Sequence, residues 1–276
     1  MHNKTLKIWL SGLVLFLFGC EANQSDLIKR VAPNQDPFPS TYKIKPHDPF
    51  MIVNTSILDG VGNLLKNTDL LIENGKIKEI GVGLPTKNYK LVNGTNFWVT
   101  PGLIDVHSHM GVYPAPGTSN HSDGNEMTSP VTAEVWAEHS VWPGDPQFEK
   151  ALAGGVTTLL ILPGSGNLIG GRGVTLKNVP SITVQGMKFP NAPYSLKMAC
   201  GENPKRVYGN RNMLPSTRMG NMAGYRKAWI KAKEYKKSWD EYLAEDSEIP
   251  LSEKPNRDLR METVSYTHLR AHETDY

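Results

Sequence analysis

Cysteine is nearly absent from this chain, which contains two cysteines among 276 residues, Cys20 and Cys200. Cys20 is expected to be modified, as argued below, so Cys200 has no partner for an internal disulfide. A large excess of charge of one sign is missing too, since the formal net charge is +3 at pH 7. That small excess is spread along the chain and gives no footprint for nucleic acid, so we expect no nucleic-acid partner.

The apolar run near the N-terminus is too short to span a membrane. Two lysines precede residues 8–18, an apolar stretch with the length of a signal-peptide core. It ends in Leu17-Phe18-Gly19-Cys20, which resembles the lipobox of bacterial lipoproteins, where the cysteine carries the lipid; a plain signal peptide is the alternative. We expect a lipoprotein signal peptide over residues 1–20, and a protein that Cys20 anchors in the cell envelope, on the periplasmic or the outer surface.

The two ends of the remaining chain differ in character from its middle. Residues 21–45 are polar and proline-rich, which predicts a flexible tether between membrane and domain. Residues 264–276 resemble the translation of a transposase adapter used for sequencing libraries, so His268 and His272 are given no weight. We exclude this tail as an artefact and expect the natural sequence to differ after Thr263.

Residues 46–100 have the pattern of β structure. Residues 50–57 form an apolar, β-branched run, and the runs 69–73 and 76–80 flank Asn74-Gly75. Asn-Gly between two such runs predicts a tight hairpin, because both turn positions need positive φ. We expect this segment to form part of a small β-sandwich.

From residue 101 onward, strands alternate with helices. Three strands are predicted, over residues 103–107, 156–162 and 194–199. Three helices are predicted, over residues 133–139, 146–153 and 221–244, the last with an apolar stripe among lysines and glutamates. The first two strands are apolar throughout, as in strands covered on both faces, so the alternation predicts βα units and a parallel sheet over residues 101–263.

Two histidines lie at the end of the first of these strands, in Pro101-Gly-Leu-Ile-Asp-Val-His-Ser-His109. Side chains alternate across a strand, so His107 and His109 point to the same side. At the carboxyl end of a βα-barrel strand that side faces the mouth, where active sites are built. Two imidazoles at this spacing suit one metal ion, and Asp105 has the same parity and is a candidate to orient them.

This motif, together with the β-rich segment before it, resembles the amidohydrolase superfamily, which includes dihydroorotases, hydantoinases and imidazolonepropionases. The resemblance covers residues 43–263. It implies an α/β fold in which a small β-sandwich segment precedes a (β/α)8 TIM-like barrel, present here as a partial barrel, its first half only. It also implies one or two divalent metal ions, zinc in our expectation, held by His107 and His109.

A further metal ligand of the family has two candidates here. Lys197, in Ser195-Leu-Lys-Met-Ala199, resembles the carboxylated lysine of hydantoinases. Glu202, in Gly201-Glu-Asn-Pro-Lys205, resembles the glutamate of the deacetylase branch. Either residue would supply an anionic oxygen that can bridge two ions, so the choice between them, and between one ion and two, stays open.

Two loops are weaker candidates. The glycine-rich residues 164–173 lack the Gly-Lys-Ser/Thr of a phosphate-binding loop, and we expect a mobile loop at the barrel mouth with Arg172 as a substrate-binding residue. Residues 121–126 group polar side chains after the first strand and either line the pocket or form a surface loop.

The resemblance implies a hydrolase of carbon–nitrogen bonds that acts on a small-molecule amide, cyclic amide or dipeptide through a metal-activated water. The aspartate that serves as the family's general base, and the histidines of its later strands, have no counterpart up to Thr263. We therefore expect no catalytic residue other than metal ligands in this chain, and no activity of the chain by itself. The alternative is a non-catalytic binding or scaffold lipoprotein of the cell surface with a similar barrel.

Replacing Cys20 by serine should release the protein from the membrane fraction of a bacterial host, because the lipid would have no attachment point. Membrane fractionation and the mass of the mature N-terminus measure the effect. Cys200→Ser is the matched control and should stay with the membranes. Unchanged fractionation of the Cys20→Ser protein, with no lipid mass on the wild type, would contradict the assignment.

Overall fold

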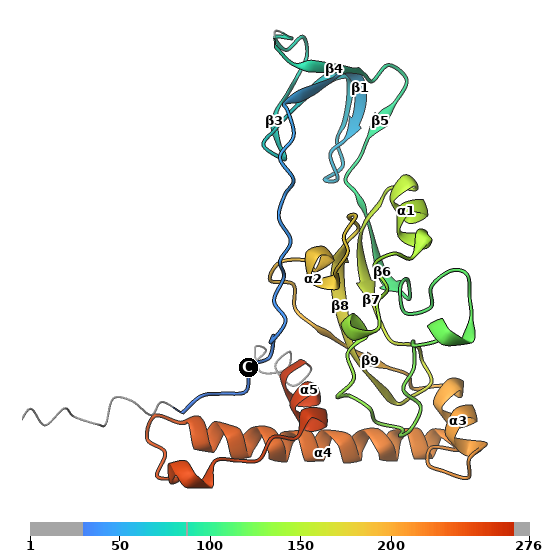
Figure 1. Cartoon of the computed structure of the whole chain (residues 1–276), viewed down its shortest axis with the longest axis vertical. Helices are drawn as coiled ribbons and strands as arrows, with labels where there is room; N and C mark the ends of the chain where they lie inside the picture. The colour runs from blue at the N-terminus through green and yellow to red at the C-terminus, as the bar shows by residue number, and fades with distance from the viewer. Residues whose placement is uncertain (1–29, 87, 268–276) are drawn as a thin grey trace, which may run out of the picture.

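The structure is a computed structural model that describes residues 30–86 and 88–267. It contains two β-sheets, at the top and the middle of Figure 1, with a long helix, α4 (Arg218–Leu243), below the second sheet. Cys20, the expected signal peptide and the two tail histidines lie outside the described residues. Within the described part of the chain, no helix has the length and apolar character needed to cross a membrane.

The first sheet has five strands: β1 (Phe50–Leu58), β2 (Leu64–Glu73), β3 (Lys76–Gly81), β4 (Lys90–Asn93) and β5 (Trp98–Val99). Their order is β3-β2-β1-β4, with β5 also paired to β1. The predicted hairpin between β2 and β3 is confirmed, since Asn74 has a φ of 53° and Gly75 a φ of 72°. A second layer against this sheet is not confirmed, so the β-sandwich stays a prediction.

The second sheet carries the histidine motif. Its strands, in order across the sheet, are β6 (Leu103–Ser108), β7 (Val156–Ile161), β8 (Ile169–Lys177) and β9 (Ser195–Met198). β6 and β7 are parallel and are connected through α1 (Pro146–Ala153), as the βα pattern predicts. β8 is antiparallel to both of its neighbours, so the expectation of a wholly parallel sheet is wrong at this strand. The result is a mixed α/β fold with a curled sheet, consistent with part of the expected barrel.

Strand β8 also corrects the expected mobile loop. Of the glycine-rich residues 164–173, those from Ile169 onward form this strand, which is largely buried. Its glycines allow close packing: a Cβ on Gly171, whose φ is 116°, would lie 2.4 Å from the carbonyl oxygen of Val135. Arg172 therefore lies on a buried strand and not in a mobile loop.

The other helices are short. They are α2 (Val184–Met187), α3 (Glu202–Gly209), α5 (Leu259–Thr267) and the 3₁₀ turns Ser119–His121, Ala137–His139 and Leu251–Glu253. The predictions of α1 and of the long α4 are confirmed. The helix predicted over residues 133–139 is reduced to its last turn, because the preceding chain pairs with β8 through Trp136 and Arg172.

Helix α4 packs against the second sheet through aromatic side chains. Trp239 is fully buried, and Tyr225 and Tyr235 lie in the same cluster with residues of β8 and β9. The predicted apolar stripe is wrong at Ile230, which is 57% exposed. Val264 of α5 is buried in this cluster as well, and the foreign origin of residues 264–276 stays a prediction.

Residues 30–49 run as an extended chain from the region of α4 to the first sheet, in blue in Figure 1. Arg30 donates to two carbonyl oxygens beyond the end of α4, at 2.6 and 3.0 Å. Ser40 donates to the carbonyl oxygen of Lys188 at 2.6 Å. Over residues 30–45, the described part of the expected tether, the chain is thus held by hydrogen bonds and is not a free linker.

Strand β6 is an edge of the second sheet and leaves apolar side chains in solvent. Leu103, Ile104 and Val106 are 57%, 65% and 69% exposed. The prediction of a strand covered on both faces is therefore wrong for β6 in the described part of the chain. An exposed apolar edge strand is a template for pairing with another chain.

We predict that residues 30–267, produced alone, self-associate through β6. Val106→Lys should reduce this association, because a charge on an edge strand opposes strand pairing. Sedimentation velocity measures the change. Val61→Lys, at a loop valine that is 84% exposed, is the control and should leave association as it is. A monomeric wild-type segment at high concentration would show the prediction to be wrong.

Candidate metal centre

His107 and His109 lie together at the carboxyl end of β6. The centroids of their rings are 5.3 Å apart and the ring planes meet at 81°. This separation allows both rings to bind one ion, because the bonding nitrogen of a histidine lies about 2 Å from zinc. The structure thus brings together the two histidines that the sequence placed on one face of the strand.

Lys197 reaches the same place from strand β9. Its Nζ lies 2.9 Å from Nε2 of His107. The lysine is 7% exposed, and its side chain extends from the opposite edge of the curled sheet. Two strands that are distant in sequence therefore supply three nitrogen-bearing side chains to one small region.

A backbone carbonyl group orients His109. Nδ1 of His109 lies 2.8 Å from the carbonyl oxygen of Leu162, just after β7. A carbonyl oxygen only accepts hydrogen bonds, so Nδ1 carries the proton and Nε2 keeps its lone pair. This is the arrangement in which a histidine binds a metal through Nε2 while its other nitrogen is held by the protein.

The electrostatics of the cluster favour neutral side chains. The positive charge of Lys197 is the main cause that lowers the pKa of His107, with smaller contributions from burial and from His109, while Asp105 opposes the shift. Burial lowers the pKa of Lys197. Neutral imidazole is the form that binds a metal ion, so the shift favours the metal-binding form of His107.

Two other expected residues are placed differently. Asp105 accepts a hydrogen bond from the backbone N–H of His107 at 3.0 Å, so it fixes the strand end and is not bonded to a histidine ring. Glu202 begins α3 with an exposed side chain and pairs with Arg206 at 3.4 Å. Of the two candidates for the further ligand, the described contacts therefore bring Lys197 to the histidines.

The cluster contains two side chains of a type that binds metal ions directly, His107 and His109. Among the residues that the structure describes, no three His, Cys, Asp or Glu side chains gather in a group that could hold a metal. The third side chain here is a lysine, whose protonated ammonium has no lone pair for a metal; the resemblance implies an anionic carbamate at this position. His107, His109 and a modified Lys197 would then provide two nitrogens and a carboxylate-like oxygen pair, which suits zinc.

A pocket of about 540 Å³ borders the cluster. It lies between His109, the loop around Asn125, residues 164–166, helix α3 and the turn that follows this helix. Tyr113 stands beside His109, with ring centroids 5.8 Å apart, and donates to Oδ1 of Asn125 at 3.0 Å. A small molecule in this pocket would therefore lie against His109.

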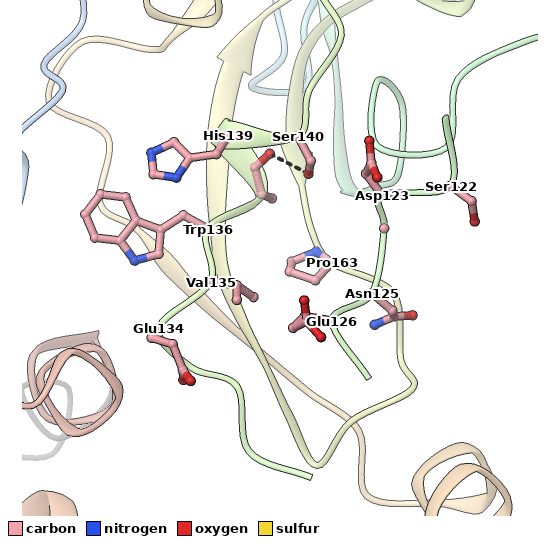
Figure 2. Close-up of a pocket in the computed structure, with 12 residues that line it drawn as sticks. Ser122, Asp123, Asn125, Glu126, Glu134, Val135, Trp136, His139, Ser140 and Pro163 are labelled. Carbon is pink, nitrogen blue, oxygen red and sulfur yellow. Dashed lines mark hydrogen bonds between the residues drawn. The ribbon is translucent and has the colours of Figure 1, made fainter. Parts of the chain in front are cut away.

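A second pocket, of about 520 Å³, is lined by residues 122–126 and 134–140. Figure 2 shows the carboxylates of Asp123, Glu126 and Glu134 among its lining side chains. Residues 122–126 of the polar loop thus line this second pocket, and Asn125 alone of the loop also lines the pocket beside His109.

Arg172 belongs to neither pocket. Its guanidinium lies 3.4 Å from the ring centroids of both Trp136 and Tyr194. It donates to the carbonyl oxygen of Gln35 at 2.8 Å, and burial lowers its pKa. The contacts of Arg172 are thus with the N-terminal segment and aromatic rings, and its predicted role in substrate binding gains no support from them.

Sequence reasoning missed Asn167, which is 1% exposed and holds the pocket loops together. Its Nδ2 lies within 2.6–3.1 Å of four oxygens, on Glu126, Ser129, Thr132 and Tyr208. The residue lies within the glycine-rich residues 164–173, and nothing in its sequence context distinguishes it from a loop asparagine.

Comparison with known proteins points in one direction. No protein-family model matches the chain. The chain is 32% identical over 234 residues to amidohydrolase tasK of Hapsidospora irregularis. The aligned region covers 77% of this chain and 24% of that protein. It is 42% identical over 59 residues to the dihydroorotase of Lactococcus lactis subsp. lactis, and this aligned region covers 21% of this chain and 14% of that enzyme.

Among solved structures, the fold is similar to that of an amidohydrolase from Thermotoga maritima MSB8, with a TM-score of 0.71 and 38% identity over 80% of this chain and 55% of that one. The curled α/β sheet, with two histidines at the end of β6, is consistent with part of an amidohydrolase barrel. These similarities support the amidohydrolase superfamily for this chain. The chain spans about half or less of the lengths of these relatives.

Asn167→Ala should lower the free energy of unfolding by about 1–3 kcal/mol, because it leaves buried oxygens without donors. Urea unfolding of the complete gene product measures the change. The exposed Asn256→Ala is the control and should change stability by less than about 0.5 kcal/mol. Equal effects of the two substitutions would mean that Asn167 does not hold the pocket loops.

Proposed function

We propose that this chain is part of a metal-dependent hydrolase that cleaves a carbon–nitrogen bond in an amide, cyclic amide or dipeptide. The observation that carries the proposal is the convergence of His107, His109 and Lys197, with Lys197 Nζ 2.9 Å from His107 Nε2. The amidohydrolase relatives support the same class of reaction. When bound, one or two divalent ions, zinc in this proposal, supply Lewis-acid activation of water.

In this proposal, each of the two histidines binds the metal ion as a neutral imidazole. The carbonyl oxygen of Leu162 holds His109 in the tautomer whose Nε2 is free to bind. While Lys197 is an unmodified amine, its charge lowers the pKa of His107, which favours the neutral ring. Both residues are at the end of a strand, so they are positioned by the sheet and not by a mobile loop.

Lys197 contributes after carboxylation in this proposal. The neutral amine attacks the carbon of CO2, an N–C bond forms, and a proton leaves to water, which gives an anionic carbamate. Burial lowers the pKa of Lys197 and so increases the fraction of the reactive neutral amine. The carbamate oxygens would then face the imidazole of His107, where the amine lies now.

The rest of the active site is proposed to come from sequence beyond Thr263. The general-base aspartate and further histidines belong there in the resemblance, and the chain's coverage of about half or less of its relatives supports this. The chain by itself is then inactive. We further propose that the complete protein is held in the cell envelope through lipid on Cys20.

We predict that His107→Asn and His109→Asn in the complete gene product lose bound metal and hydrolase activity together, because each removes a ligand. Elemental analysis of purified protein measures the metal. His47→Asn, at an exposed histidine before the first sheet, is the control and should keep both. Wild-type metal content in either ligand variant would remove the main support for the proposal.

The same assay separates the two candidates for the further ligand. Lys197→Met should lose metal, whereas Glu202→Gln should retain it, because the contacts of Glu202 are with Arg206 and solvent. The reverse result would assign the ligand to Glu202.

A further inference from the structure

The pocket beside His109 is lined by two arginines and by no carboxylate. Arg206 and Arg211 face it from α3 and from the turn that follows, together with Asn203 and Asn125. We propose that this pocket binds a substrate with a carboxylate group close to the scissile carbon–nitrogen bond, as in an N-acyl amino acid or a dipeptide. The inference rests on the proposed function, since it names the substrate class of the same site.

Arg211 is the principal cation in this proposal. Its Nη1 donates to the carbonyl oxygen of Met127, and its guanidinium lies 5.8 Å from the ring centroid of Tyr208. Both partners are uncharged, so they orient the guanidinium without neutralising it. An arginine with a free positive charge and a planar donor edge is suited to a carboxylate.

Arg206 takes a supporting part. Its Nη2 lies 3.5 Å from Oδ1 of Asn203, and its Nε lies 3.4 Å from the carboxylate of Glu202. The ion pair with Glu202 compensates part of its charge, which leaves Arg211 as the stronger anion-binding group. Nδ2 of Asn203 donates in turn to Oγ of Ser165 at 2.7 Å, so α3 is connected to the loop on the opposite wall of the pocket.

The charge of the neighbouring pocket indicates where an anion would go. Asp123, Glu126 and Glu134 contribute carboxylates to the pocket in Figure 2. Arg260 pairs with Glu134, so Asp123 and Glu126 are the carboxylates that repel an anionic group there. The pocket that His109 lines has the opposite sign. An anionic substrate that approaches the strand ends is thus directed to the pocket next to the proposed metal ligands.

The test uses the complete gene product loaded with zinc, and matched pairs of N-acetyl amino acids and dipeptides with a free C-terminal carboxylate or a C-terminal carboxamide. We expect kcat/KM to be at least about tenfold higher for the carboxylate member of a pair, because a charged hydrogen bond is lost in the carboxamide. Calorimetric titration of the same compounds gives a second, activity-independent measure of binding.

Arg211→Gln should remove the preference, by raising KM or Kd about tenfold for carboxylates and leaving carboxamides unchanged, whereas Arg211→Lys should keep part of it. Arg226→Gln, at an exposed arginine of α4 outside this pocket, is the matched control and should change neither. Folding of each variant is checked by its zinc content, which Arg211 does not affect in this proposal.

The outcomes distinguish a failure of the proposed function from a failure of the inference about the carboxylate. A wild-type protein without bound metal overturns the proposed function. A protein that binds zinc but treats carboxylates and carboxamides alike, or that neither binds nor cleaves any carboxylate of the panel, overturns the inference and leaves the metal centre standing. Equal losses for both members of a pair in Arg211→Gln would show that this arginine only supports the Met127 loop.

Discussion

The contact between Lys197 and His107 depends on the curl of the second sheet. The two residues lie on β9 and β6, which are the edge strands and are separated by β7 and β8. Three strand spacings in a flat sheet amount to about 14 Å, further than a lysine and a histidine side chain reach together. The observed separation of 2.9 Å exists because the edges approach each other. The candidate metal centre is thus a product of sheet curvature as much as of its residues.

Strand β8 makes this arrangement possible in two ways. It is antiparallel to both neighbours, so β9 runs in the same direction as β6 and their carboxyl ends lie on the same side. Its glycines let other groups approach closely. A Cβ on Gly173 would lie 2.4 Å from Oγ of Ser195, which is on β9 two residues before Lys197. The glycine-rich segment therefore shapes the site through backbone packing, without contributing a side chain to it.

The sequence was informative where a local pattern determines structure. Alternation along β6 was enough to predict that His107 and His109 face one side, and Asn74-Gly75 was enough to predict a hairpin. It was less informative about β8, because glycines carry no periodic pattern that marks a strand. The choice between Lys197 and Glu202, and the orientation of Arg211, depend on contacts between distant segments, which no local pattern contains.

The attachment of the N-terminal segment also decides how the molecule carries mechanical load. Arg30 bonds to carbonyl oxygens beyond α4 and lies 5.3 Å from the ring centroid of Tyr242, near the end of that helix. A force applied to the chain before Arg30 therefore enters the fold at the end of α4. The first sheet begins only at Phe50, so it is strained only after the contacts of Arg30 and then those of Gln35 and Ser40 have broken.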